Sequence, residues 1–97
     1  MSQVGRALAV TGFQQITSLS TSTSFTVPTA ILGSDFAYVT CEGQAVRWRD
    51  DGTDPTASIG HRLAVNGVLE YDGPLTEIEF IEEASGAILN ISYYKYI

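Results

Sequence analysis

The chain has very few of the side chains from which catalytic and redox centres are built. Its 97 residues include one cysteine, Cys41, and one histidine, His61. A single cysteine permits no intrachain disulfide and no thiolate metal cluster, so Cys41 is expected to be a small core residue. A catalytic Ser/His/Asp or Cys/His arrangement needs a base with an oriented partner, and nothing in the pattern supplies one for His61. We therefore expect a protein that is not an enzyme and that holds no metal and no cofactor.

Positive charge is also scarce. Five basic residues stand against eleven acidic ones, which gives a formal net charge of −6. The sole lysine is Lys95, and Arg47, Arg49 and Arg62 are the only basic group within one region. A protein that follows nucleic-acid phosphates needs clustered Lys and Arg, and so does one that binds an anionic membrane. Neither direct nucleic-acid binding nor membrane binding is expected.

Long apolar runs are missing as well. The run from Ala7 to Val10 is far too short for the hydrophobic region of a signal peptide. No stretch approaches the length needed to span a bilayer. We expect the protein to be made in the cytoplasm, and either to stay there or to leave inside a larger assembly.

What the chain does have is a series of short alternating segments. Val46–Arg49 alternates apolar and basic residues, and Asp, Gly and Pro then end the alternation. Asn66-Gly67 is a strong signal for a two-residue hairpin, because both positions tolerate positive φ. Seven or eight such segments, with no helical period, predict an all-β protein. With 44% apolar residues in one short domain, we favour a single antiparallel β-sandwich that is jelly-roll-like.

The segments divide the chain into an arm and a domain. Residues 1–12 lack clean periodicity and are expected to be an N-terminal arm, and residues 13–97 are expected to be the β-sandwich domain. The expected strands are 13–19, 25–27, 36–41, 45–49, 61–65, 68–71, 75–82 and 87–95. The Ser/Thr run from Thr17 to Ser24 is expected to be an exposed strand or a linker.

The last expected strand carries apolar residues on both faces, which indicates burial on both sides. One of these sides could pack against another subunit, and a homo-oligomer is expected. Tyrosine is well suited to such a contact because its ring is apolar and its hydroxyl is polar. The candidate interface residues are Tyr93, Tyr94, Tyr96 and Ile97.

Two acidic groups admit a second interpretation. The aspartates of Asp50–Asp54 weakly resemble a calcium loop, but their spacing does not fit the EF-hand pattern and a wide turn explains them. The four glutamates between Glu77 and Glu83 include paired carboxylates of the kind that glycoside hydrolysis uses. On alternating strand positions they are expected to form a solvated or partner-facing acidic face.

The aromatic residues leave a sugar-binding alternative open. Trp48 and Tyr71, together with the C-terminal tyrosines, could form a stacking platform for a pyranose ring. In the preferred interpretation Trp48 and Tyr71 lie in the core and the C-terminal tyrosines seal a subunit interface. Exposure of Trp48 would favour sugar binding, and its burial would count against it.

An ordered set of turns and strands covers about half of the chain, from Ala45 to Lys95. It consists of Val46–Thr53, Pro55–Ser58 with Gly60, Leu69–Tyr71, Ile78–Ile81 and Gly86–Tyr94. This set resembles a group of small all-β proteins that are encoded among the structural genes of tailed bacteriophages.

The resemblance implies a non-enzymatic virion structural protein, most of all a capsid decoration (cement) protein that binds and stabilises the head shell. The expected partners are then the major capsid protein or other virion proteins, and the expected location is the virion. An arm such as Met1–Gly12 could reach a neighbouring subunit. A tail or head–tail component of the same β class remains an alternative, as does a carbohydrate- or receptor-binding module.

Overall fold

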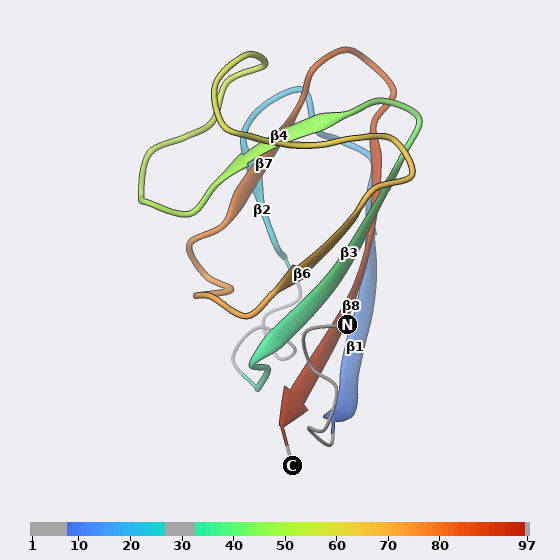
Figure 1. Cartoon of the computed structure of the whole chain (residues 1–97), viewed down its shortest axis with the longest axis vertical. Coiled ribbons are helices and arrows are strands. Elements are labelled where there is room, and N and C mark those ends of the chain that lie inside the picture. Colours follow the sequence, from blue (N-terminus) through green and yellow to red (C-terminus); the bar gives the residue numbers. More distant parts are fainter. Residues whose placement is uncertain (1–7, 27–32, 97) are drawn as a thin grey trace.

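The computed structural model describes residues 8–26 and 33–96, which form two four-stranded antiparallel sheets packed face to face (Figure 1). Sheet A has the strand order β1-β8-β3-β6 and sheet B the order β2-β7-β4-β5. The strands are β1 Leu8–Ile16, β2 Thr23–Ser24, β3 Phe36–Glu42, β4 Val46–Arg49, β5 His61–Leu63, β6 Val68–Tyr71, β7 Glu79–Glu82 and β8 Ile88–Tyr96. The predicted antiparallel β-sandwich is confirmed.

The strand pairing defines a jelly roll. The first four strands pair in reverse order with the last four: β1 with β8, β2 with β7, β3 with β6 and β4 with β5. This is the pattern of a long antiparallel ribbon folded back on itself. Pairing of β8 with β3 and of β7 with β4 then rolls the ribbon into two sheets.

Strand β1 begins earlier than the sequence predicted. Residues 8–12, assigned above to the arm, form the first half of β1 and pair with the end of β8. A bulge between Val10 and Gly12 places an extra residue in the strand, so that the period-2 pattern is interrupted. This bulge explains why the strand was not recognised from alternation, and residues 1–7 of the expected arm lie outside the described residues.

The Asn66-Gly67 hairpin prediction is wrong, although the turn is present. Asn66 has a φ of 65°, and the Gly67 N–H donates to the Ala64 carbonyl at 2.8 Å. The turn connects β5 in sheet B to β6 in sheet A instead of joining two paired strands. Backbone hydrogen bonds link it to the end of β3, with Asn66 N–H donating to Cys41 O at 2.7 Å. The Asn-Gly signal therefore predicted where the chain turns, but not which strands pair with each other.

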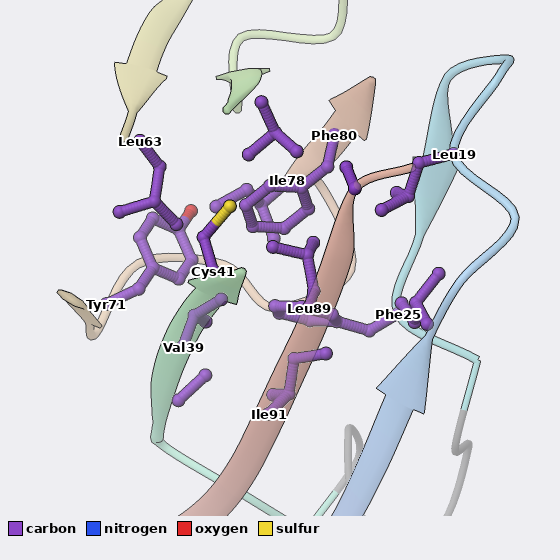
Figure 2. Packing of buried hydrophobic residues seen from close by; sticks show 14 of the residues in the cluster. Leu19, Phe25, Val39, Cys41, Leu63, Tyr71, Ile78, Phe80, Leu89 and Ile91 are labelled. Carbon is purple, nitrogen blue, oxygen red and sulfur yellow. The ribbon is translucent and has the colours of Figure 1, made fainter. Parts of the chain in front are cut away.

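The core lies between the two sheets, and Figure 2 shows side chains from both sheets meeting there. Its members are buried hydrophobic residues, among them Val39 and Leu89 from sheet A and Phe80 from sheet B. Phe25 packs edge-on against Tyr93 and also contacts Phe80, with ring centroids 5.4 and 5.5 Å apart. Cys41 is buried in this core, as the sequence predicted, and its burial raises the pKa of the thiol.

Candidate interaction surface

Strand β8 runs through the middle of sheet A and has one buried and one half-buried side. Leu89, Ile91 and Tyr93 point into the core, where each is fully buried. The intervening residues, such as Ser92 and Tyr94, point to the opposite side of the sheet and remain half-buried. Sheet A therefore has a second face, which no described strand covers.

We call this second face the outer face of sheet A. The registers of β1, β3 and β6 identify its members, because residues directly opposite one another share a face. They are Val10, Phe13 and Gln15 on β1, Ile88, Asn90, Ser92, Tyr94 and Tyr96 on β8, Phe36, Tyr38, Thr40 and Glu42 on β3, and Val68 and Glu70 on β6.

The outer face of sheet A mixes apolar and aromatic side chains with uncharged polar ones and carries little charge. Val10, Phe13 and Val68 are 67%, 60% and 51% exposed, and Glu42 and Glu70 are its only charged members. Val10 and Phe13 lie together on β1 at one edge of this face, and Val68 lies on β6 at the other edge. Large exposed apolar side chains on a face with little charge favour its use as a binding surface.

Local contacts hold the two ends of this face in place. The rings of Phe36 and Tyr94 lie 6.1 Å apart, and Phe36 is only 1% exposed although it is outside the core between the sheets. The Gln15 side-chain amide donates to Asn90 Oδ1 at 2.9 Å. The surface is therefore built from side chains that contact each other across neighbouring strands.

The outer face of sheet B has the opposite chemistry. Arg47 Nε and Arg62 Nε both donate to Glu83 Oε2, at 2.7 and 3.0 Å, and Arg49 is paired with Asp51. Hydrogen bonds from Arg62 and then Arg47 hold the pKa of the Glu83 carboxyl below its ordinary value. The basic group noted in the sequence is thus largely neutralised within the chain.

The structure places the four residues predicted to form an interface in different environments. Tyr93 does not contribute surface, because it is 0% exposed and its hydroxyl donates to Gln14 Oε1 at 2.6 Å. Tyr94 lies on the outer face of sheet A, and its neighbour Tyr96 is half-buried near the end of β8, with its N–H donating to Asp35 Oδ2 at 3.0 Å. Ile97 lies outside the described residues.

Trp48 is half-buried at one end of the sandwich and does not form an open platform. Its indole lies 4.6 Å from the His61 ring and 5.9 Å from the Tyr71 ring, centroid to centroid, and it packs against the core. The Tyr71 hydroxyl donates to Asp50 Oδ2 at 2.9 Å, and burial together with this carboxylate raises the pKa of Tyr71. The Trp48 face that a sugar would need is thus partly covered by the chain itself.

Most of the acidic side chains considered above make structural contacts. Asp51 accepts from Arg49 and from the Thr53 N–H, as a wide turn requires. Glu79 accepts from the Ser22 hydroxyl at 2.7 Å, and Glu82 accepts from the N–H groups of the 86–87 turn.

Within residues 8–26 and 33–96, no three His, Cys, Asp or Glu side chains are grouped so as to hold a metal ion. The same residues contain no helix that is long and apolar enough to cross a bilayer.

Comparisons with protein-family models, with curated proteins and with solved structures found no match to this chain. The chain is therefore classified by its fold alone, as a jelly-roll β-sandwich. Val10, Phe13 and Val68 were not identified as surface residues from the sequence. Val10 was assigned to the arm because a β-bulge interrupts the alternation there. Phe13 was placed in a strand, but the sequence alone does not say which side of that strand, or of β6, faces the core.

Proposed function

We propose that the protein is a non-enzymatic structural component of a tailed-bacteriophage virion, most specifically a capsid decoration protein, which binds the head shell through the outer face of sheet A. The observation that carries this proposal is the small charge of that face together with its exposed apolar side chains, of which Phe13 and Val68 are more than half exposed. The resemblance of residues 45–95 to small phage structural proteins supplies the partner: the major capsid protein or another virion protein.

The composition of the face supports binding to another protein. The central part of a protein interface is depleted of charged residues and enriched in aromatic ones. Phe13, Tyr38 and Tyr94 fit this pattern, because they lie on three adjacent strands of sheet A and point to the same side. Removing apolar surface of this kind from water is favourable by about 25 cal/mol per Å², before the entropic cost of association is subtracted.

The fold supports the proposal only by analogy. Jelly rolls occur in viral capsid proteins, but also in lectins and cupins, so the fold alone does not select a function. The Trp48 contacts with His61 and Tyr71 count against the lectin-like alternative, because they cover part of the indole. A tail or head–tail component would use the same outer face of sheet A on a different partner.

The proposal is tested by co-sedimentation of the purified full chain with undecorated capsids of its source phage. A decoration protein saturates the capsids at a fixed molar ratio per shell. Purified tails, incubated in parallel, distinguish the second candidate. Saturable binding to tails and none to capsids would replace the decoration role by a tail role, and binding to neither would reject the virion proposal.

A further inference from the structure

Strand β1 is one of the two edge strands of sheet A, and no other described strand pairs with its outer side. It pairs with β8 on one side only, and in Figure 1 it forms the margin of the sheet beside β8. Among the described residues, only those of β8 hydrogen-bond to the β1 backbone. The strand is nine residues long and contains neither a charged residue nor a proline. It therefore offers a long row of backbone donors and acceptors.

The direction of the backbone groups on β1 follows from contacts at the other side of β8. The Asp35 N–H donates to Tyr94 O at 2.8 Å, and the Tyr96 N–H donates to the Asp35 carboxylate, so the even-numbered residues of β8 point toward β3. In an antiparallel pair, residues opposite one another bond together or point apart together. Phe13 and Gln15 lie opposite Ser92 and Asn90. Their N–H and C=O groups consequently point outward, away from β8.

Natural proteins protect such edges by keeping them short, charged or interrupted by proline. The other edge strands follow this rule. β2 has two residues, β5 has three and includes Arg62, and β6 has four and includes Glu70. In β1 the only such device is the bulge at Val10–Gly12, and Phe13–Ile16 continues regularly beyond it. This edge is therefore suited to pairing with another strand.

We propose that the partner is a second copy of this chain, whose β1 pairs antiparallel with the first across a two-fold axis. An antiparallel edge is self-complementary under a two-fold axis, because outward groups on Phe13 and Gln15 then meet equivalent groups of the other copy. The charge distribution also favours β1 as the contact between two copies. Two copies that each carry a net charge of −6 repel each other, and β1 is an edge that brings no carboxylate into the contact.

Side-chain exposure agrees with the same pairing. Val10 and Phe13 belong to β1 and are two of the most exposed large apolar residues of the described chain. Joining the two β1 strands brings these side chains next to those of the second copy on one continuous sheet. The dimer rests on the geometry of β1 alone and does not depend on binding to a virion.

The first test is the molar mass of the full chain by light scattering during gel filtration. The wild type should have twice the 10.5 kDa mass of one chain. Gln15→Pro should weaken dimerisation by about tenfold or more, because it removes an outward donor from each copy and leaves the β1–β8 ladder intact. Val68→Lys is the matched control at the opposite edge of the same face, and it should remain a dimer.

The second measurement is amide hydrogen exchange at several protein concentrations. Protection of the Phe13 and Gln15 amides should rise with concentration, whereas the Gln14 and Ile16 amides, which face β8, should be protected throughout. If Gln15→Pro lacks the circular dichroism of the wild type, Phe13→Lys takes its place in the mass measurement. A monomeric wild type, an assembly of another size, or a dimer that persists in the folded edge variant would overturn the proposal. A failure of capsid binding with the dimer intact would reject only the decoration role.

Discussion

The two outer faces of this sandwich arise from the same alternation and have opposite chemistry. On sheet B, residues pointing away from the core form ion pairs, as Arg47 and Arg62 do with Glu83. On sheet A, the equivalent positions carry side chains such as Phe13, Tyr38 and Val68. The paired charges of sheet B are satisfied in water, whereas the exposed apolar side chains of sheet A are stabilised when another surface covers them.

Apolar residues in the strands of sheet A have two different roles. Leu89 and Ile91 are apolar because they fill the space between the sheets, and their replacement would affect folding. Phe13 is 60% exposed and contributes little to that core. We therefore expect substitutions on the outer face of sheet A to change association more than stability.

The largest expected effect contrasts a buried and an exposed phenylalanine. Phe80→Ala should lower the free energy of unfolding by about 3–5 kcal/mol, because it leaves a cavity beside Phe25. Phe13→Ala should change it by less than about 0.5 kcal/mol in the monomer. Urea unfolding at low protein concentration measures both. Similar losses for the two variants would mean that Phe13 belongs to the core.

A smaller effect distinguishes the adjacent tyrosines of β8. Tyr93→Phe should cost about 1 kcal/mol, because it removes the buried hydroxyl that donates to Gln14 Oε1. The Thr26 N–H also donates to this oxygen, so the acceptor keeps one partner. Tyr94→Phe, on the outer face of sheet A, is the control and should be nearly neutral. Thermal unfolding of both variants checks the expectation, which an equal cost would contradict.

The smallest effect concerns the ion pairs of sheet B. Because the arginines lower the pKa of Glu83 in the folded protein, its stabilisation is complete at neutral pH and is lost as the pH falls and the carboxyl protonates. Glu83→Gln should therefore destabilise the protein slightly at pH 7 and not in acid, and salt should reduce the difference. Glu42→Gln, on sheet A, is the control. A pH-independent effect of Glu83→Gln would exclude this electrostatic origin.

Alternation predicted much of this fold, and its failures have physical causes. The outward arginines of Val46–Arg49 were recognised because the two sides of that strand differ in polarity. Strand β8 carries apolar residues on both sides, so alternation established the strand but did not show that Tyr93 points inward. In β1 a bulge puts Val10 and Phe13 three residues apart on one face, a spacing that no period-2 pattern contains.

A side-by-side capsid titration tests whether the protein binds through sheet A and not through sheet B. Tyr38→Lys places a charge in the middle of the outer face of sheet A. Ser24→Lys places the same charge on the outer side of sheet B, where Ser24 lies opposite Glu79. We predict that Tyr38→Lys weakens capsid binding by about tenfold or more and that Ser24→Lys changes it by less than about twofold. Equal binding by both variants, or a greater loss for Ser24→Lys, would contradict binding through the outer face of sheet A.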